Sequence, residues 1–464
     1  MDSGKDTAAG KKSNAKYSKD LMMVNPHAAG LDLHQKELWA CAGPLENGKP
    51  PEVKVFGTYS GRLRSLVAWL REKGVESVAM ESTGVCWVPP HRFLREAGLA
   101  VMLVNSRGTK AVKGRPKTDK QDCMWICRLH SYGLPRGSFV PDGLVADLRG
   151  LWRCRGKVVA ESSRAIQRMN KAMLAMNCRL DIAVSDISGL SGLRIVDAIL
   201  AGERDPLRLA ALGDRRVQKS QAEIARALDG RFAEAQLRAL EEWRAHHRFH
   251  QGRPGTLNGK ILELLKRFPD RSDGKEPPPA KANYKEDSLG FPEPPRPLLF
   301  KAFGVDLTQL AGVGVAVAVS FLAVVGTEVG AWPAERHFAS WLGLSPVAQI
   351  SAGRAKEAKS KKTGNPLSAA LKIAAMAAQR TDSAIGAAGR RLKARLGPGK
   401  AKTAVARKLA VVLHRVVKDG QDAVRHSAAE HEARWREQQL KRLRAQAWKL
   451  GYDLSAASAP AATP

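Results

Sequence analysis

The sequence predicts a multidomain chain in which an α/β domain comes first and mostly helical regions follow. Two patterns indicate this division. Between residues 28 and 106, short apolar runs of strand type alternate with helix-type segments, whereas residues 143–268 keep helical spacing throughout. A chain of 464 residues is also long enough for roughly two to four domains, each with its own core.

The α/β region begins with three strands in succession, two within residues 29–43 and a third in 52–60. A helix, a strand, a helix, a strand and a last helix then follow at residues 61–74, 75–82, 87–98, 99–106 and 119–133. Three strands followed by this alternation is the order of a ribonuclease-H-like domain. A doubly wound nucleotide-binding fold instead needs a helix between its first two strands and a glycine fingerprint after the first.

The rest of the chain divides by composition. The helical region after residue 143 predicts a helical hairpin or coiled coil that supports oligomers, or an ordinary bundle. Residues 270–297 hold seven prolines among many charges and predict a linker, after which the pattern is helical to about residue 450. The expected segments are a disordered basic tail (1–27), the α/β domain (28–142), the helical region (143–269), the linker (270–297), a C-terminal domain (298–425) and a basic helix with its tail (426–464).

The charge of the chain predicts a polyanionic partner. Lys and Arg number 76 against 45 acids, and residues 351–420 hold 17 basic residues against 3 acids. Lys and Arg that contact phosphates release condensed counterions, which favours binding at low salt. Nucleic acid is therefore the favoured partner, ahead of an anionic membrane surface.

Cysteines and apolar runs predict a soluble, cytoplasmic protein without a membrane partner. The six cysteines include no CxxC pair, and the N-terminal residues have no apolar signal-peptide core. The most apolar run, residues 310–326, is shorter than the roughly 20 residues that cross a bilayer. Cys123, Cys127 and His130 share helical spacing, which favours a buried helix face over a metal-binding face.

Four acids in the α/β region predict a metal site. Asp32 lies within the first strand, and Glu81 ends the fourth strand of the sequence. Asp119 and Asp122 stand i, i+3 at the start of a helix, where alone they indicate an N-cap and a first-turn acid. In the ribonuclease-H order the first and fourth strands are neighbours, so the acids come together. Because like charges disfavour one another, such a cluster needs a cation. Mg²⁺ or Mn²⁺ suits carboxylate ligands, and a pair of these ions can assist phosphoryl transfer.

The C-terminal half offers two further features. Gly312 and Gly314 lie between helical segments, as in a helix-hairpin-helix element whose backbone N–H groups meet a phosphate, although close packing explains such glycines equally well. Ser351 is predicted in a loop, where cations that follow it would stabilise a phosphoryl group under attack by its hydroxyl. Alone, a Ser–Gly loop is typical of a turn. These cations are Arg354, Lys356, Lys359, Lys361 and Lys362.

The motifs GLDLHQKELWACA, MESTGVCWVP, GRPKTDKQDCMWICRLHSYGLPRGSF and QISAGRAKEAKSKKTGNPLSAALKIAA carry a resemblance to a known family. Over residues 28–425 the chain resembles the DEDD-type insertion-sequence transposases of the one-hundred-and-ten family, with features of the eleven-eleven subgroup. Members of this family are guide-RNA-directed serine recombinases.

The resemblance implies a RuvC-like domain at 28–142 and a transposase domain at 298–425 with Ser351 as its nucleophile. It places the family's four acids on Asp32, Glu81, Asp119 and Asp122, with Mg²⁺ or Mn²⁺ bound. Ser351 would form a transient phosphoserine link to DNA. The basic residues Arg115, Lys117 and Lys120 become candidates for phosphate contacts near the metal.

The resemblance also implies partners. A non-coding guide (bridge) RNA would pair with donor and target DNA, and each site would combine parts of two protomers in a homo-oligomer, from dimer to tetramer. Ala352, where many relatives have glycine, is a small departure from the pattern.

Two other functions stay open. A RuvC-like metal-dependent nuclease for DNA junctions would use the acids with water as the nucleophile. A non-catalytic nucleic-acid-binding protein would need neither the acids nor Ser351. Ser351 therefore distinguishes among these three functions.

Overall fold

A computed structural model of the chain describes residues 22–43, 51–82, 84–105, 118–141, 143–281, 289–351, 354–360, 363–420 and 422–454. Side chains of residues 347–359, 422–432, 434 and 435 also lie outside the described part. The chain divides into two compact units, Met1–Val140 and Pro141–Pro464.

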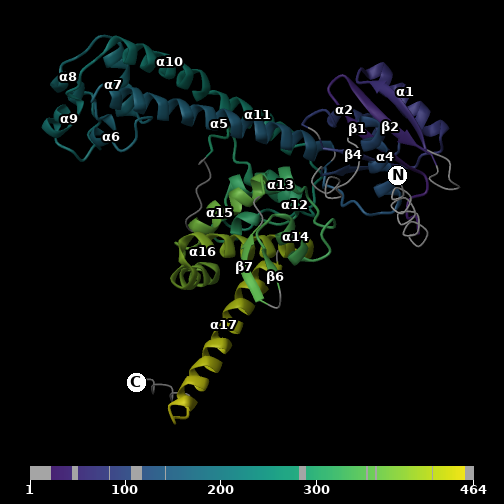
Figure 1. Ribbon diagram of the computed structural model, residues 1–464. Helices are drawn as coiled ribbons and strands as arrows, with labels where there is room; N and C mark the ends of the chain where they lie inside the picture. The colour runs from purple at the N-terminus through teal and green to yellow at the C-terminus, as the bar shows by residue number, and fades with distance from the viewer. Residues whose placement is uncertain are drawn as a thin grey trace, which may run out of the picture. The chain divides into compact units, whose positions relative to one another are not determined.

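The N-terminal unit holds a five-stranded sheet with helices (Figure 1). Its elements are β1 (Ala28–Leu33), β2 (Glu37–Ala42), β3 (Glu52–Gly57), α1 (Ser60–Glu72), β4 (Ser77–Glu81), α2 (Val88–Glu96), β5 (Ala100–Val104) and α4 (Asp119–Ser131). The strand order is β3-β2-β1-β4-β5; β1, β2 and β3 pair antiparallel, and β4 runs parallel to both β1 and β5. The predicted ribonuclease-H-like, or RuvC-like, fold is confirmed.

Side-chain alternation gives the sheet two different faces. Leu31 and Leu33 of β1 pack with Leu66 and Leu70 of α1 in one buried cluster. Residues on the other face of the sheet meet α4, as Ala79 does in its cluster with Ile126. Asp32 therefore shares the α4 face of β1 with Gly30.

The start of α4 differs in one detail from the sequence prediction. The side chain of Thr118, not that of Asp119, caps the helix by accepting a hydrogen bond from the Gln121 N–H at 3.3 Å. Asp119 and Asp122 both lie in the first turn, where carboxylates interact favourably with the helix dipole. Because Thr118 caps the helix, the carboxylate of Asp119 can make other contacts.

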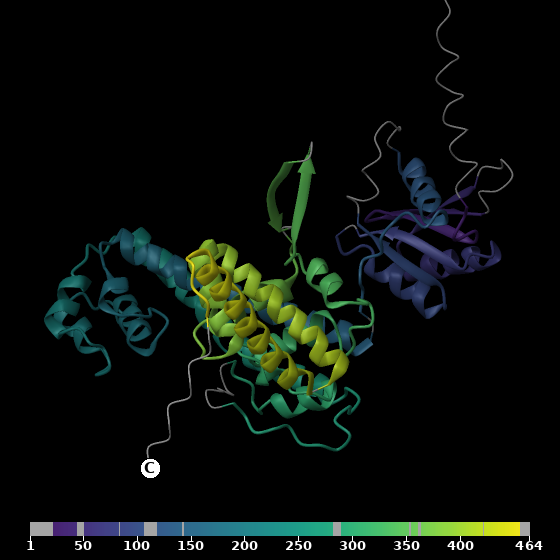
Figure 2. The same cartoon turned by 90° about the horizontal axis from the view of Figure 1, so that it is seen from below.

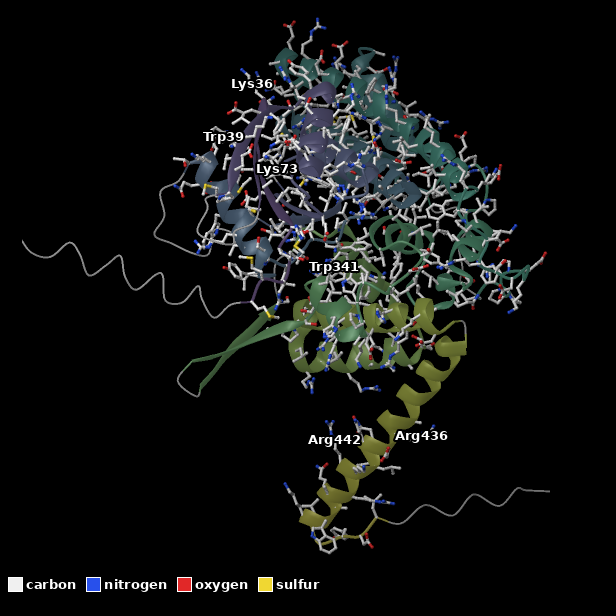
Figure 3. All side chains as sticks on the ribbon, turned by 90° about the vertical axis from the view of Figure 1, so that its right-hand side faces the viewer. Lys36, Trp39, Lys73, Trp341, Arg436 and Arg442 are labelled. Atoms are coloured by element: carbon white, nitrogen blue, oxygen red, sulfur yellow. The ribbon has the colours of Figure 1, made fainter. Side chains whose placement is uncertain are left out.

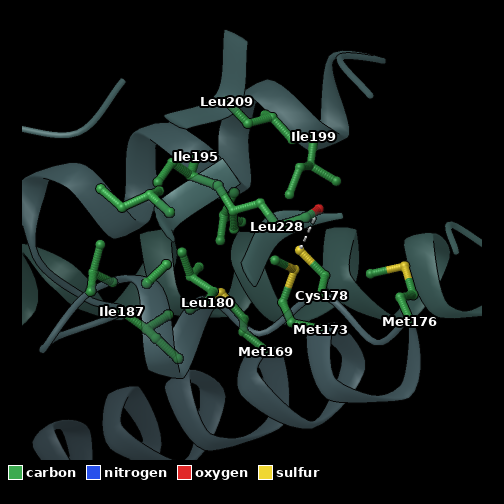
Figure 4. Close-up of a cluster of buried hydrophobic side chains, with 14 of the residues drawn as sticks. Met169, Met173, Met176, Cys178, Leu180, Ile187, Ile195, Ile199, Leu209 and Leu228 are labelled. Carbon is green, nitrogen blue, oxygen red and sulfur yellow. Dashed lines mark hydrogen bonds between the residues drawn. The ribbon is translucent and has the colours of Figure 1, made fainter. Parts of the chain in front are cut away.

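The C-terminal unit begins with a helical hairpin, one of the arrangements expected for this region. The helices are α5 (Gly143–Ala175), α6 (Leu180–Ala183), α7 (Leu190–Leu200), α8 (Pro206–Ala211), α9 (Gln221–Leu228), α10 (Glu234–Gln251) and α11 (Arg253–Leu265). Both α10 and α11 pack along α5 (Figure 1). The short helices close a buried core at one end of the hairpin, where Met169 and Met173 of α5 meet Ile195, Leu209 and Leu228 (Figure 4).

The remaining elements are α12 (Arg296–Phe303), η1 (Leu307–Gln309), α13 (Val315–Val324), α14 (Glu335–Trp341), β6 (Pro346–Ser351), β7 (Arg354–Ser360), α15 (Pro366–Ala378), α16 (Ala384–Asp419) and α17 (Asp422–Lys449). The apolar run at 310–326 supplies α13, which is buried nearly all round. Arg149 of α5 donates hydrogen bonds to the Ala323 and Val324 carbonyls at 2.9 and 2.6 Å, so its guanidinium caps the C-terminal end of α13.

The expectation that Ser351 lies in a loop of a helical domain is wrong. Ser351 is the last residue of β6 and pairs with Arg354 of β7 in an antiparallel hairpin. This hairpin extends away from the helices of its unit (Figure 2). Ala and Lys, which predominate in β7, are poor strand formers, so the sequence pattern did not indicate a strand.

The helix-hairpin-helix interpretation of residues 310–326 also needs correction. The chain before Gly312 forms a single 3₁₀ turn, η1, rather than a helix. A Cβ on Gly312 would lie 2.3 Å from the Ala374 carbonyl oxygen, and its φ is +76°. Close packing against α15 therefore accounts for this glycine, whereas a Cβ on Gly314 would meet nothing within 4 Å.

The segment predicted as a linker is fastened to the C-terminal unit over its described residues. The Lys281 ammonium donates to the carbonyls of Leu310 and Val313, both at 2.8 Å, and burial lowers the Lys281 pKa. Arg296 donates to the carbonyl of Pro278. These side chains hold the Pro-rich residues against the loop that precedes α13.

Helix α17 ends the described chain with a polar, basic surface. Arg436 and Arg442 are exposed and project from it (Figure 3). Among the described helices, none combines the length and the apolar character that a bilayer crossing requires.

Candidate metal centre and serine hairpin

The acid cluster starts at the ends of two neighbouring strands. Leu31 of β1 pairs with Met80 of β4, so the next residues, Asp32 and Glu81, lie alongside each other. Asp32 is 7% exposed and Glu81 is 9% exposed. Alternation puts Glu81 on the same face as Ala79, which packs against α4, and so both carboxylates face that helix.

Gly30 lets α4 approach β1 closely enough to complete the cluster. A Cβ at this position would lie 2.3 Å from the Cys127 backbone nitrogen and 2.4 Å from the Cys123 carbonyl oxygen. Glycine is therefore required where the helix backbone rests on the strand. This contact sets the distance between α4 and β1, and the first turn of α4 carries Asp119 and Asp122.

Two other acids of the cluster act on the charge of Asp32. Burial raises the pKa of Asp32 above its usual value, and the charges of Asp122 and Glu81 raise it further. The charge of His34, and a hydrogen bond from it, act in the opposite direction. Like charges in a poorly solvated site make one another costly, so this cluster favours a bound cation.

His34 joins Asp32 to Asp119 and was missed by the sequence prediction. Its Nε2 lies 3.2 Å from Asp32 Oδ2 and 3.3 Å from Asp119 Oδ1. A signal was present, because His34 follows Asp32 by two residues and an extended chain turns alternate side chains to the same face. The structure thus links all four predicted acids: Asp122 and Glu81 act on Asp32 through charge, and Asp119 meets it through His34.

The donor set suits a divalent ion. One ligand atom each from Asp32, His34 and Asp119 lie within 4.8 Å of one another. Carboxylate oxygens are the ligands that Mg²⁺ and Mn²⁺ prefer, and imidazole nitrogen is a common ligand of transition metals. The residues present therefore fit a bound metal.

The cysteine prediction is confirmed. Cys123 and Cys127 of α4 form a fully buried cluster with Cys41 of β2, next to Gly30. Burial raises the pKa of the Cys123 thiol to about 12, so it stays a neutral thiol. His130 is also buried, and its Nε2 lies 2.9 Å from Ser77 Oγ. This face of α4 packs against the sheet and so supports the acid cluster.

Several predicted nucleic-acid contacts fall outside the described residues. These are Arg115, Lys117, Lys361 and Lys362, together with the side chains of Arg354, Lys356 and Lys359. The side chain of Ser351, the predicted nucleophile, also lies outside the described residues. Lys120 is described and is exposed at the start of α4, one residue after Asp119.

Two family models match the chain. Residues 29–177 match a transposase model of the DEDD type in the IS110 family, and residues 306–389 match the model described as Transposase IS116/IS110/IS902 family. The chain carries transposase domains of the IS110 family. Such domains are those of enzymes that cleave DNA and exchange its strands. The second match includes Ser351 and the whole β6–β7 hairpin.

Among solved structures, two of RuvC from Thermus thermophilus are similar to part of the chain. One is RuvC in complex with a Holliday junction substrate; it is 16% identical, covers 24% of this chain and 98% of its own, and has a TM-score of 0.20. The other is a structure of RuvC. It is also 16% identical, covers 24% of this chain and 99% of its own, and has a TM-score of 0.20. No curated protein matches the chain.

Proposed function

We propose that this chain is the transposase of a mobile insertion sequence and that it cuts and rejoins DNA with two groups of residues. One group is the acid cluster, Asp32, Glu81, Asp119 and Asp122, with Mg²⁺ or Mn²⁺ as cofactor. The other is Ser351 on the β6–β7 hairpin. The convergence of Asp32, His34 and Asp119 in a chain with transposase domains carries the proposal.

The acids hold the cofactor and orient the scissile phosphate. When bound, a divalent ion supplies charge that offsets the negative charge developing on phosphoryl oxygens. Asp32 and Glu81 are held in position by the backbone of two paired strands, so they form the rigid part of the site. Asp119 and Asp122 complete the site from the first turn of α4. Lys120 between them contacts a neighbouring phosphate in this proposal, and its exposure at the start of α4 supports that role.

Ser351 acts as the nucleophile. Its Oγ forms a bond to the scissile phosphorus, the bond from phosphorus to one deoxyribose oxygen breaks, and the Ser351 proton passes to that leaving oxygen through solvent. A hydroxyl of a second DNA end then attacks the phosphoserine, which restores Ser351 and joins the new strand. The number of phosphodiester bonds is conserved, so no oxidant, reductant or nucleotide is consumed.

A non-coding guide RNA supplies sequence recognition, and the protein binds nucleic acid backbone. The excess of 76 basic residues over 45 acids supports this division, because phosphate contacts position a protein without reading sequence. The homo-oligomer, from dimer to tetramer, allows one protomer to bring Ser351 to the acid cluster of another.

Ser351→Ala tests the serine step. We expect the variant to lose DNA strand exchange on donor and target duplexes while DNA and RNA binding in gel-shift assays stay unchanged. Asp119→Asn and Glu81→Gln should each abolish metal-dependent cutting, because each removes a ligand charge. Full strand exchange by Ser351→Ala would refute the serine mechanism, and unchanged rates in both acid variants would refute the metal role.

A RuvC-like nuclease is the second candidate, and the RuvC-like fold of the N-terminal unit favours it. In that case the acids direct water at the phosphate and Ser351 has no role. Ser351→Ala would then still cut branched DNA at the wild-type rate, and no protein–DNA adduct would form with the wild-type chain. A covalent adduct that disappears in Ser351→Ala excludes this candidate.

A further inference from the structure

His34 is mounted on a tight turn that fixes the position of its backbone. The turn joins β1 to β2, and the His34 N–H donates to the Glu37 carbonyl at 3.0 Å. Thr58 Oγ1 donates to the Gln35 carbonyl at 3.1 Å, which anchors the turn to the end of β3. The imidazole therefore extends from a restrained backbone toward the acid cluster, as a preorganised ligand does.

The distances around His34 match those between metal ligands. In an octahedral site with bonds of about 2.1 Å, adjacent ligand atoms are about 3 Å apart. Nε2 of His34 lies 3.2 Å from Asp32 Oδ2 and 3.3 Å from Asp119 Oδ1. The same nitrogen thus faces one oxygen from each of two carboxylates, and a small ion between the three atoms would need little rearrangement.

We infer that His34 is a direct ligand of the divalent ion in this site and that its nitrogen shifts the metal preference from Mg²⁺ toward Mn²⁺. This inference rests on the proposed metal role of the acid cluster. Mg²⁺ keeps oxygen ligands and water, whereas imidazole suits transition metals, and Mn²⁺ is the transition ion that carboxylates also accept.

Imidazole chemistry explains why histidine fits this position. A lysine or arginine here would pair with the two carboxylates but has no lone pair for a metal. An imidazole donates from Nε2 to a carboxylate in the metal-free protein and offers the Nε2 lone pair when its proton is on Nδ1. The side chain of His34 is 45% exposed, so burial in a core does not account for its placement.

A purely hydrogen-bonding role for His34 makes the opposite prediction. If the imidazole only bridges Asp32 and Asp119, it competes with the metal for their oxygens. Its removal would then leave the affinity for Mn²⁺ unchanged or increase it. If His34 is a ligand, its removal weakens Mn²⁺ binding.

Pulsed electron paramagnetic resonance of Mn²⁺ bound to the full chain tests the inference, because it detects nitrogen bonded to the ion. We expect nitrogen coupling in the wild type and its loss in His34→Ala and His34→Gln. His27→Ala is the matched control, since His27 is exposed and precedes the opposite end of β1. This variant should keep the coupling and the wild-type Mn²⁺ affinity.

Calorimetric titration with MnCl₂ and with MgCl₂ supplies the second measurement. His34→Ala should weaken Mn²⁺ binding by about tenfold or more and Mg²⁺ binding less, so the preference for Mn²⁺ falls. His34→Gln offers an amide oxygen instead, and should lower that preference while retaining Mg²⁺ binding. Circular dichroism checks that the variants fold.

The failure of this inference differs from the failure of the proposed function. If Mn²⁺ binds to the wild type without nitrogen coupling, and Asp32→Asn abolishes that binding, His34 is not a ligand although the acid site stands. If Asp32→Asn and His34→Ala both bind Mn²⁺ as the wild type does, neither the site nor the inference survives. Unchanged or tighter Mn²⁺ binding in His34→Ala overturns the inference.

Discussion

Asp306 and Asp32 are both buried acids, but their surroundings differ. Asp306 in the C-terminal unit is 2% exposed and receives hydrogen bonds from the Arg296 guanidinium, from Thr308 and from Gln309. Asp32 in the N-terminal unit is 7% exposed and faces His34 and other carboxylates. Arg296 neutralises Asp306, and this pair stabilises the fold, whereas we propose that Asp32 takes its cation from solution.

The largest effect should come from breaking the Asp306 pair. Arg296→Met leaves a carboxylate buried without its guanidinium, which costs about 3–5 kcal/mol in such pairs. Urea denaturation followed by circular dichroism measures the loss for the C-terminal unit. Adding Asp306→Asn to Arg296→Met should recover part of it, and equal stability of the single variant and the wild type would contradict this account of Asp306.

Gly30→Ala should have the second-largest effect on stability, because the added methyl group displaces α4 without changing any charge. The new Cβ meets the α4 backbone at 2.3 Å, so α4 must shift, at a cost of about 1–3 kcal/mol. Because α4 carries two of the acids, Mn²⁺ affinity should fall as well. Gly57→Ala on β3 is the matched control, since its Cβ would meet only the flexible Arg62 side chain at 3.4 Å. Equal melting temperatures and Mn²⁺ affinities in the two variants would refute the packing role of Gly30.

Asp32→Asn should stabilise the metal-free protein at neutral pH. The substitution removes a buried charge that burial, Asp122 and Glu81 together disfavour more than His34 favours it. A single stabilising substitution typically gains about 0.5–2 kcal/mol. Thermal denaturation in a chelating buffer measures it. Destabilisation instead would show that Asp32 belongs with Asp306 as a structural acid.

The smallest effect concerns Asp197 of α7, which accepts two hydrogen bonds of 2.7 Å from Arg244 of α10. Arg244 lowers the pKa of Asp197, so the pair stabilises the fold above the unfolded pKa of about 3.9 and loses this contribution as pH falls through the lower folded value. Asp197→Asn should cost about 1 kcal/mol at pH 7, since the carboxylate is partly exposed, and almost nothing near pH 2. Urea denaturation at both pH values tests this, and a cost that does not change with pH would contradict it.

The sequence predicted how the acids of the N-terminal unit lie together, because the signals for this arrangement are local. Strand alternation and strand order bring Asp32 next to Glu81, and i, i+3 spacing puts Asp119 and Asp122 on one helix face. The role of Gly30 was not predictable in this way, because it depends on a helix that begins about ninety residues later in the chain. His34 carries a local signal, its spacing of two from Asp32, but a histidine lies outside the pattern of four acids on which the prediction rests.

The C-terminal unit was predicted less completely because tertiary contacts decide its details. A basic, alanine-rich strand gives no alternating apolar pattern, so β7 was expected to be loop or helix. Proline and charge in residues 270–297 indicate a linker, yet the half-buried Lys281 donates hydrogen bonds to carbonyls that follow it by about thirty residues. Gly312 matches a phosphate-binding glycine by sequence, and only its contact with α15 identifies it as a packing residue.

The central claim, that the acid cluster holds a divalent ion, is tested most directly by calorimetric titration of MnCl₂ into the full chain. We predict that the wild type binds Mn²⁺, that the Asp32→Asn, Asp122→Asn double variant does not, and that Asp197→Asn binds as the wild type does. Equal Mn²⁺ binding by the wild type and the double variant, or no binding by either, would contradict the claim.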